Sequence, residues 1–195
     1  MIRLPRISNF TDFSPFERYG NVSLRYVDSV GDLHQPDMII LPGTKSTIAD
    51  LRWLRQCGLE AAIHKAADAG TLVFGVCGGY QMLGRTVSDP EQVEAAGTTE
   101  ILGMGLLEMD TIFLGEKVQA QTTGVFAGIS GVLSDLNGMS YSGYEIHMGR
   151  SEEEMPALAG TGNVYGSYVH GVFDASGISD TILKALCVRK GIDFD

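Results

Sequence analysis

Apolar residues in the first half of the chain alternate between short continuous runs and repeats at helical spacing. The runs at 22–27, 37–41 and 71–76 predict strands, and the last two are apolar enough to be buried on both faces, as parallel strands are. Apolar residues at helical spacing over 46–58 and 59–70 predict two helices, each of which ends at a glycine. The predicted order from residue 37 is strand, helix, helix, strand.

The second half of the chain shows a weaker pattern. Strand-like pieces recur around Leu106 and at 118–123, 144–148 and 164–169, and a periodic helix occupies 179–190. Strands that alternate with helices predict an α/β fold of three layers with an open, mostly parallel sheet.

Length and composition favour a single soluble domain. The 195 residues, 44% of them hydrophobic, are enough for one core and few for two. No run reaches the roughly 18 apolar residues that a membrane span needs, and the first residues lack the apolar centre of a signal peptide. We therefore expect one domain over 1–195, with no membrane partner, in the cytoplasm.

Charge and cysteine spacing exclude further classes of protein. Lys and Arg number 14 against 24 Asp and Glu, and the net charge of −10 repels a phosphate backbone, so nucleic acid is not an expected partner. Cys57, Cys77 and Cys187 lie far apart without paired spacing. This spacing predicts reduced thiols and no metal site.

The segment from Gly75 to Gly79 carries the strongest chemical signal. It reads Gly-Val-Cys-Gly-Gly, follows a predicted buried strand and precedes a short helix. This order is typical of a nucleophile elbow, in which the nucleophile is strained and the residues two positions away must be small. Backbone N–H groups at the start of the helix favour a thiolate. The pattern predicts that Cys77 is a nucleophile.

A lone cysteine is more often a buried filler than a catalytic group. We assign the filler role to Cys57 and Cys187, which lie on or at the end of helices among apolar residues and lack flanking glycines. Cys77 alone has strand, glycines and helix in the order that an elbow requires, so the catalytic interpretation is favoured there.

A cysteine nucleophile needs a base, and the chain has four histidines. His64 lies between apolar positions of a predicted helix and His34 in a polar loop, which favours structural or solvated roles for both. His170 ends the apolar stretch 164–169, and α/β sheets gather their site residues at strand ends. We therefore predict that His170 is the base.

Acyl transfer also needs donors for the developing oxyanion, and two backbone N–H groups are the usual solution. The elbow supplies the N–H of Gly78. The second donor can be Gly43, in the Pro-Gly-Thr turn that ends the strand at 37–41, because glycine lets the backbone approach closely. An ordinary turn at this position is the alternative.

The same turn resembles the end of a phosphate-binding loop, since Lys45 and Ser46 follow it. That motif requires a glycine directly before the lysine, where this chain has Thr44. No other stretch fits a nucleotide-binding fingerprint. We therefore expect no cofactor bound by this chain.

Five motifs together resemble a known family. The segment 75–84, G-V-C-G-G-Y-Q-M-L-G, is similar to the nucleophile segment of class I glutamine amidotransferases. The segments 3–13, 41–47, 143–149 and 168–174 give a closer likeness to the glutaminase half of the cobyric acid synthase family. The motifs span most of the chain, and the resemblance implies a flavodoxin-like fold.

The resemblance also implies a reaction. Cys77 would attack the side-chain amide of glutamine, His170 would protonate the departing ammonia, and water would release glutamate from the thioester. Gln81 would help to hold the substrate. The ammonia would pass to a synthetase domain, with its own ATP and Mg²⁺, that amidates corrinoid carboxylates in cobalamin biosynthesis. The chain would then be a portion of a larger two-domain enzyme or a separate subunit.

One position departs from many class I members, which carry a glutamate two residues after the catalytic histidine. Val172 occupies that position here. We therefore expect a cysteine–histidine dyad whose histidine is oriented by Glu145 or by a backbone carbonyl. Tyr144, Glu145 and His147 either line the glutamine site or present alternate polar side chains to solvent, and the sequence leaves both interpretations open.

Two other functions are compatible with the same motifs. The chain could be the glutaminase of another branch, such as cobyrinic acid a,c-diamide synthase or a peptidoglycan amidotransferase, with a different acceptor. It could also be an inactive module that senses glutamine, although intact Cys77 and His170 argue against this. Glutamate release, with and without a synthetase domain, would separate these functions.

Overall fold

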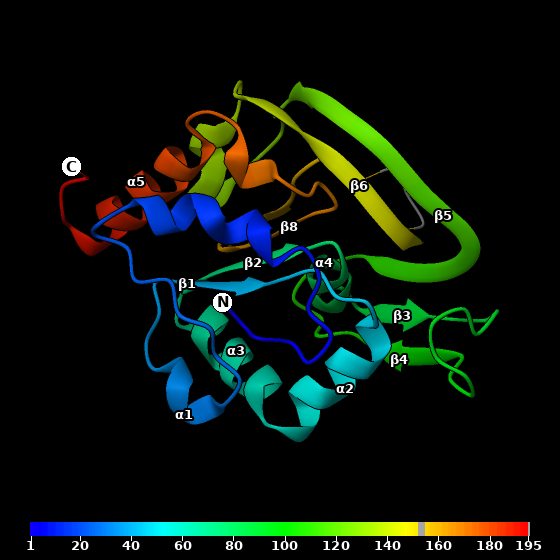
Figure 1. The fold of residues 1–195 in the computed structure, drawn as a ribbon. Helices are drawn as coiled ribbons and strands as arrows, with labels where there is room; N and C mark the ends of the chain where they lie inside the picture. Colours follow the sequence, from blue (N-terminus) through cyan, green and yellow to red (C-terminus); the bar gives the residue numbers. More distant parts are fainter. Residues whose placement is uncertain (152–154, 195) are drawn as a thin grey trace.

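The computed structural model describes residues 1–151 and 155–194 (Figure 1). The central sheet has the strand order β1-β2-β8-β7. β1 (Met38–Leu41), β2 (Leu72–Val76) and β8 (Val164–Ser167) are parallel, and β7 (Ala159–Thr161) is antiparallel at one edge. The sheet is open and mostly parallel, as the sequence predicted.

Helices cover both faces of this sheet. In Figure 1, α1 (Val30–Leu33), α2 (Thr47–Gln56) and α3 (Leu59–Asp68) lie on one side, and α5 (Ile178–Lys190) lies on the other with the 3-10 helix η1 (Phe10–Arg18). No helix in the described ranges is long and apolar enough to cross a membrane. The prediction of three layers is confirmed.

Alternate residues of the central strands contribute to two separate cores. Ile39 and Leu41 of β1 and Val73 of β2 pack with α2 and α3, whereas Ile40 and Phe74 pack on the α5 side. Successive residues of a strand point to opposite faces, so each strand is buried on both sides. Burial on both faces explains why these strands appear in the sequence as continuous apolar runs.

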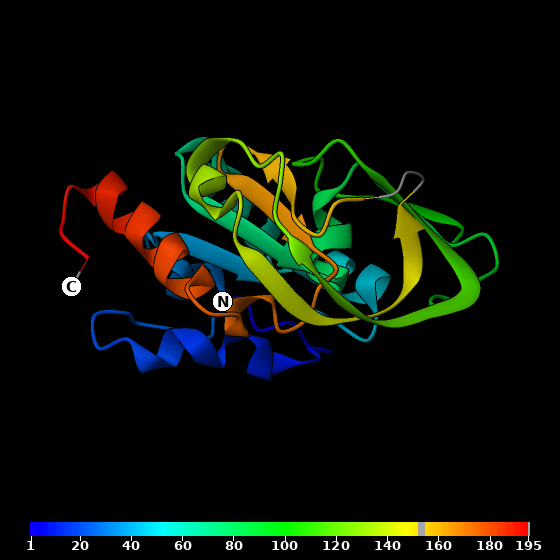
Figure 2. The same ribbon diagram turned by 90° about the horizontal axis from the view of Figure 1, so that it is seen from above.

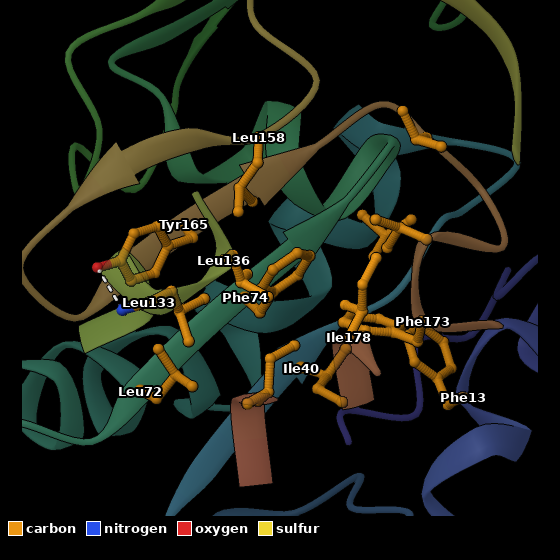
Figure 3. Packing of buried hydrophobic residues seen from close by; sticks show 14 of the residues in the cluster. Phe13, Ile40, Leu72, Phe74, Leu133, Leu136, Leu158, Tyr165, Phe173 and Ile178 are labelled. Carbon is orange, nitrogen blue, oxygen red and sulfur yellow. Dashed lines mark hydrogen bonds between the residues drawn. The ribbon is translucent and has the colours of Figure 1, made fainter. Parts of the chain in front are cut away.

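Two short 3-10 helices, η2 (Gly131–Leu136) and η3 (Val172–Asp174), complete the core on the α5 side. Figure 3 shows this core close up. The ring of Phe173 in η3 packs against Phe74 and Phe13, with centroid distances of 4.9 and 6.0 Å. Since Phe13 belongs to η1, this contact attaches the N-terminal part of the chain to the sheet.

A second sheet has the strand order β4-β3-β5-β6. β3 (Thr86–Ser88) pairs antiparallel with β4 (Glu100–Leu102) and parallel with β5 (Asp110–Val125). β5 and β6 (Ser140–Ser151) form a long antiparallel hairpin with one irregularity in its register. In Figures 1 and 2 this hairpin lies beyond the end of the central sheet where α4 (Gly78–Leu83) begins.

Two of the predicted strands are wrong. In the segment 22–27, only Val27 makes a ladder contact, a single bridge to Ile2, because no strand of the described residues pairs with the rest of the segment. Around Leu106 the chain turns instead of pairing, since the Leu106 N–H donates to the Leu83 carbonyl oxygen at 2.9 Å.

The other predicted elements are confirmed. The pieces at 118–123 and 144–148 lie within β5 and β6, and the piece at 164–169 contains β8. The helix expected over 179–190 is α5, which ends at Gly191 with φ of 68°. A left-handed glycine at this position is a common helix terminator.

Candidate active site

The turn between β2 and α4 holds Cys77 in a strained backbone conformation. Its φ of 50° and ψ of −110° lie outside the regions that a non-glycine residue normally adopts. Gly75 and Gly79 permit this turn. A Cβ on Gly75 would lie 2.7 Å from the Gly79 backbone, and one on Gly79 would lie 2.1 Å from the carbonyl oxygen of Leu41. The elbow geometry predicted from the glycine spacing is present.

The Cys77 thiol lies between the two sheets. Only 6% of the residue is exposed, and its Sγ is 3.5 Å from the carbonyl oxygen of Ile146 in β6. The His170 side chain lies close enough to the thiol for the interaction between them to raise the pKa of His170. The long hairpin therefore covers the nucleophile, and the predicted nucleophile and base lie together. We refer to Cys77 and His170 as the catalytic pair.

His170 follows the end of β8 and is 1% exposed. Its Nδ1 lies 2.7 Å from Oδ2 of Asp12, and the N–H of Gly171 donates to the other oxygen of that carboxylate at 3.2 Å. The side-chain amide of Asn9 lies 3.2 Å from Nδ1 as well. The Asn9 amide nitrogen also lies 3.3 Å from Nε2. An Nδ1–H that donates to Asp12 leaves Nε2 for contacts with Asn9 and with the thiol.

The surroundings of His170 favour its charged form. Burial alone would lower the pKa of His170, but hydrogen bonds with Asp12 and Cys77, together with the negative charge of those two groups, raise this pKa from 6.5 to about 9. His170 is therefore an imidazolium at neutral pH. This is the charge state that a thiolate–imidazolium pair requires.

The sequence did not indicate Asp12. The expected partner of His170 was Glu145 or a backbone carbonyl, and this expectation is wrong: the Glu145 carboxylate lies 3.4 Å from Nε2 of His147 instead. Asp12 belongs to η1 and is 4% exposed, so it makes the dyad a triad. The one available signal was an acidic residue inside the segment 3–13, which carries part of the family resemblance.

The turn after β1 lies against the elbow, as expected for neighbouring parallel strands. A Cβ on Gly78 would lie 3.2 Å from the backbone nitrogen of Thr44, and one on Gly43 would lie 3.1 Å from Cε1 of His170. Gly43 and Gly78 therefore lie beside the catalytic pair. Their role as oxyanion donors stays a prediction.

Gln81 and Tyr144, two of the predicted substrate-binding residues, lie close to the catalytic pair. Gln81 is 2% exposed and its Oε1 accepts a hydrogen bond from the Thr47 hydroxyl at 3.0 Å, whereas its Nε2 has no partner among the described residues. Tyr144 exchanges both backbone hydrogen bonds with His170, and its ring stacks on the imidazole with centroids 5.2 Å apart. A buried amide without a partner is a group that a bound substrate can satisfy.

Glu145 and His147 do not share these contacts. The His147 ring stacks on Tyr168 with centroids 4.1 Å apart, and its Nδ1 lies 2.6 Å from the carbonyl oxygen of Gly149. The His147 side chain is only 7% exposed, so a solvated strand face is the wrong interpretation for this residue. Within the described part of the chain, neither side chain bonds to the catalytic pair, and their role in binding substrate stays a prediction.

The residues assigned to structural or solvated roles lie elsewhere. His34 is exposed after α1, and His64 is half-buried on α3. Cys57 and Cys187 are free, half-buried thiols, and Sγ of Cys57 lies 3.6 Å from the carbonyl oxygen of Leu54. No group of three or more His, Cys, Asp or Glu residues within 1–151 and 155–194 could hold a metal ion.

A strained buried cysteine with a histidine and a carboxylate in line is the arrangement of a cysteine-dependent acyl transfer site. Residues 1–178 match the family described as the CobB/CobQ-like glutamine amidotransferase domain. The chain belongs to this family. The predicted class of enzyme is thereby confirmed.

Curated relatives of the domain include cobyric acid synthases. The synthase of Lachnoclostridium phytofermentans is 50% identical over 220 residues, and that of Ruminiclostridium cellulolyticum is 44% identical over 214 residues. Both alignments cover 100% of this chain, which spans only 42% and 41% of the relatives' own length. More than half of each relative therefore lies outside the region of similarity.

Solved structures agree on the fold. PurLQS from Thermotoga maritima matches the domain with a TM-score of 0.64 at 20% identity, and a crystal structure of a glutamine amidotransferase matches with a TM-score of 0.62 at 16% identity. Each comparison covers 95% of this chain and 96% of the other. At these identities the likeness shows the fold alone, and it confirms the predicted class I glutamine amidotransferase architecture.

Proposed function

We propose that the domain hydrolyses glutamine to glutamate and ammonia through a thioester on Cys77, and that the ammonia serves to amidate corrinoid carboxylates in cobyric acid synthesis. The observation that carries the chemistry is the buried line of contacts from Cys77 through His170 to Asp12. The family match supports glutamine as substrate, and the names of the relatives support the acceptor.

In the first step the Cys77 thiolate attacks the side-chain amide carbon of glutamine and a C–S bond forms. Negative charge develops on the amide oxygen, where the N–H groups of Gly43 and Gly78 would stabilise it. The His170 imidazolium then gives its Nε2 proton to the amide nitrogen, the C–N bond breaks and ammonia leaves. The products of this step are a thioester and a neutral imidazole.

In the second step the neutral His170 removes a proton from water, whose oxygen attacks the thioester carbon. The C–S bond breaks, glutamate leaves, and the thiolate and imidazolium are restored. Asp12 accepts the Nδ1 hydrogen bond throughout. Its negative charge stabilises the imidazolium and holds the ring in the required tautomer.

Substrate binding falls first to Gln81 and Tyr144, because both lie next to the catalytic pair. The free Nε2 of Gln81 can donate to a substrate oxygen. Glu145 and His147 follow Tyr144 on β6, where alternate side chains point to opposite faces. A direct contact of Glu145 or His147 with glutamine would therefore come from the face opposite to Tyr144.

The acceptor chemistry would belong to a partner of this domain. Amide formation from a carboxylate requires activation, and we expect an ATP-dependent synthetase domain or subunit that holds ATP, Mg²⁺ and the corrinoid. The part of each relative outside the region of similarity is long enough to form such a domain. We place the reaction in the cytoplasm, where thiols stay reduced.

The test is glutamate release by this chain, measured alone and with the synthetase portion, ATP and a corrinoid acceptor. Hydrolysis that Cys77→Ala abolishes, together with transfer of ¹⁵N from the glutamine amide to the corrinoid, is the expected result. Transfer only to a different acceptor would assign the domain to another branch of the family. Absence of glutamate release under both conditions would contradict hydrolysis itself.

A further inference from the structure

Asp50 is a buried carboxylate that the mechanism above does not use. It lies in the first turn of α2 and is 0% exposed. Its oxygens accept hydrogen bonds from Arg6 Nη1 at 2.9 Å, from the Arg6 backbone N–H at 3.2 Å and from the Thr44 hydroxyl at 2.5 Å. Burying a carboxylate away from water costs free energy unless its oxygens are fully paired. The hydrogen bonds to Asp50 therefore form a specific buried arrangement.

Thr44 connects Asp50 to the turn that follows β1. Its hydroxyl donates to Asp50 and accepts a hydrogen bond from the Ser46 N–H at 3.1 Å, which fixes the side chain from both sides. Its backbone nitrogen lies beside Gly78 of the elbow. Among the described residues, the N–H groups of Gly43 and Thr44 have no acceptor. They are therefore available to an oxyanion.

Arg6 connects the same carboxylate to the N-terminal strap, which we define as residues 3–13. The strap also bonds directly to the turn, because Lys45 N–H donates to the Arg6 carbonyl oxygen at 3.0 Å and Ser8 N–H donates to the Gly43 carbonyl oxygen at 2.9 Å. Asp12, which orients the base, belongs to this strap as well. Asp50 is thus bonded to two of the elements that approach the catalytic pair from outside the elbow, the strap and the turn after β1.

We infer that Asp50 is a positioning residue for glutamine hydrolysis, which acts by fixing the Gly43–Thr44 turn so that its N–H groups face the developing oxyanion. The inference rests on the proposed function. A peptide next to glycine rotates at little cost, so a donor in this turn needs an anchor outside it. A charge-assisted hydrogen bond from the Thr44 hydroxyl to a buried carboxylate is a strong anchor of this kind.

The test compares variants of this chain by kcat and KM for glutamine hydrolysis. Thr44→Val keeps the shape of the side chain and removes the hydroxyl, and Asp50→Asn keeps the shape and removes the charge. Because loss of one oxyanion donor lowers kcat by about 100-fold to 1000-fold, we expect a loss of about tenfold or more in kcat for both variants, with a smaller change in KM. Thr44→Ser, which keeps the hydroxyl, should recover most of that loss.

Two measurements separate positioning from a general loss of structure. Alkylation of Cys77 by iodoacetamide needs the thiolate and no oxyanion donor, so its rate should stay close to wild type in Thr44→Val. Glu60→Gln is the matched control, because it breaks a partly buried ion pair with Arg55 at 2.7 Å that lies away from the turn. Its kcat should equal that of the wild type, whatever its effect on the thermal midpoint.

The inference fails if Thr44→Val keeps kcat within about twofold of wild type, or if its alkylation rate falls in parallel with kcat. It fails as well if Thr44→Ser is no better than Thr44→Val. A wild-type chain that releases no glutamate, alone or with the synthetase portion, would overturn the proposed function and this inference together. Normal wild-type hydrolysis with unaffected variants would overturn the inference alone.

Discussion

The elbow and the N-terminal strap both shape the catalytic site, but they do so by different physical means. The elbow fixes Cys77 through backbone geometry within the short segment 75–79, where glycines permit contacts that any side chain would block. The strap fixes His170 through side-chain contacts, and Asp12 lies 158 residues before the histidine that it orients. The nucleophile therefore depends on local steric fit, and the base depends on an electrostatic partner supplied by the tertiary fold.

This comparison implies that changes in the elbow should damage the fold, whereas changes in the strap should damage catalysis and leave the fold intact. The largest effect is expected for Gly79→Ala. The new Cβ would lie 2.1 Å from the carbonyl oxygen of Leu41 and 2.7 Å from that of Pro42, and these backbone atoms cannot rotate away. We expect a loss of about 3 kcal/mol or more in the free energy of unfolding, measured by denaturant titration.

Gly20→Ala is the matched control for this change, because nothing lies within 4 Å of a Cβ at that position. Its stability should stay near that of the wild type. A Gly79→Ala variant as stable as Gly20→Ala would show that the elbow tolerates a side chain. This result would contradict the claim that local steric fit fixes Cys77.

The next largest effect is expected for Asp12→Asn in the strap. The amide keeps the shape of the carboxylate but removes the charge that stabilises the imidazolium, so kcat should fall by about 100-fold or more. The thermal midpoint should change little in comparison with Gly79→Ala. The measurement is kcat for glutamate release beside thermal unfolding of the same preparation.

Asp180→Asn serves as its control, since Asp180 accepts a hydrogen bond from Tyr19 at the surface and does not contact the catalytic pair. Its kcat should match the wild type. If Asp12→Asn also retained kcat within about threefold, a Cys77–His170 dyad would be sufficient and the strap would have no catalytic role.

The same contrast between local and long-range structure explains what the sequence could predict of the fold. The central strands 37–41 and 71–76 were predictable because burial on both faces leaves a continuous apolar run. The segment 22–27 was also predicted as a strand, but a strand needs a partner to pair with, and the pattern of one segment does not report its neighbours. For the same reason, the pairing of β5 with β3 and β6 could not be predicted from the sequence.

The residues of the candidate active site also fall into two groups, those that local sequence patterns predict and those that they do not. Cys77 and His170 could be predicted because glycine spacing and strand ends are local signals. The roles of Asp12 and Asp50 could not be predicted. Each contacts its partner only through the tertiary fold, so no local sequence pattern marks these two acidic residues. The cap of α2 is a further example: the N–H groups of Thr47 and Ile48 donate at 2.7 Å to the carboxylate of Glu94, which lies in a distant loop.

A change in pH should have an effect of intermediate size on the rate of glutamate release. The pKa of His170 is about 9 in the folded chain, above its ordinary value of 6.5. Glutamate release should therefore decrease as pH rises through about 9, because the imidazolium that protonates ammonia is lost. The stability contributed by His170 follows the same sign: it is fully present below pH 6.5 and is lost as pH rises through about 9.

Asp12→Asn sharpens this test, because the Asp12 hydrogen bond and charge are among the causes that raise the pKa of His170. The alkaline decrease in kcat should move to lower pH in this variant. The measurement is a kcat profile for both proteins across neutral and alkaline pH. An unchanged alkaline limb would show that Asp12 does not set the charge state of the base.

The smallest effect is expected for His147→Ala, which tests whether proximity in sequence to Tyr144 implies a role in catalysis. His147 stacks on Tyr168 and bonds to Gly149, so its loss removes packing and not a member of the catalytic pair. A stacked aromatic pair is worth about 0.5–1.5 kcal/mol, and the thermal midpoint should fall accordingly while kcat stays within about fivefold of wild type.

His170→Ala should instead lose nearly as much activity as removal of the nucleophile, because nucleophile and base act as one unit. Measuring kcat and the thermal midpoint for both variants separates the two roles. If His147→Ala lost more activity than His170→Ala, the base would lie on β6, and the strap would orient a histidine that the reaction does not use.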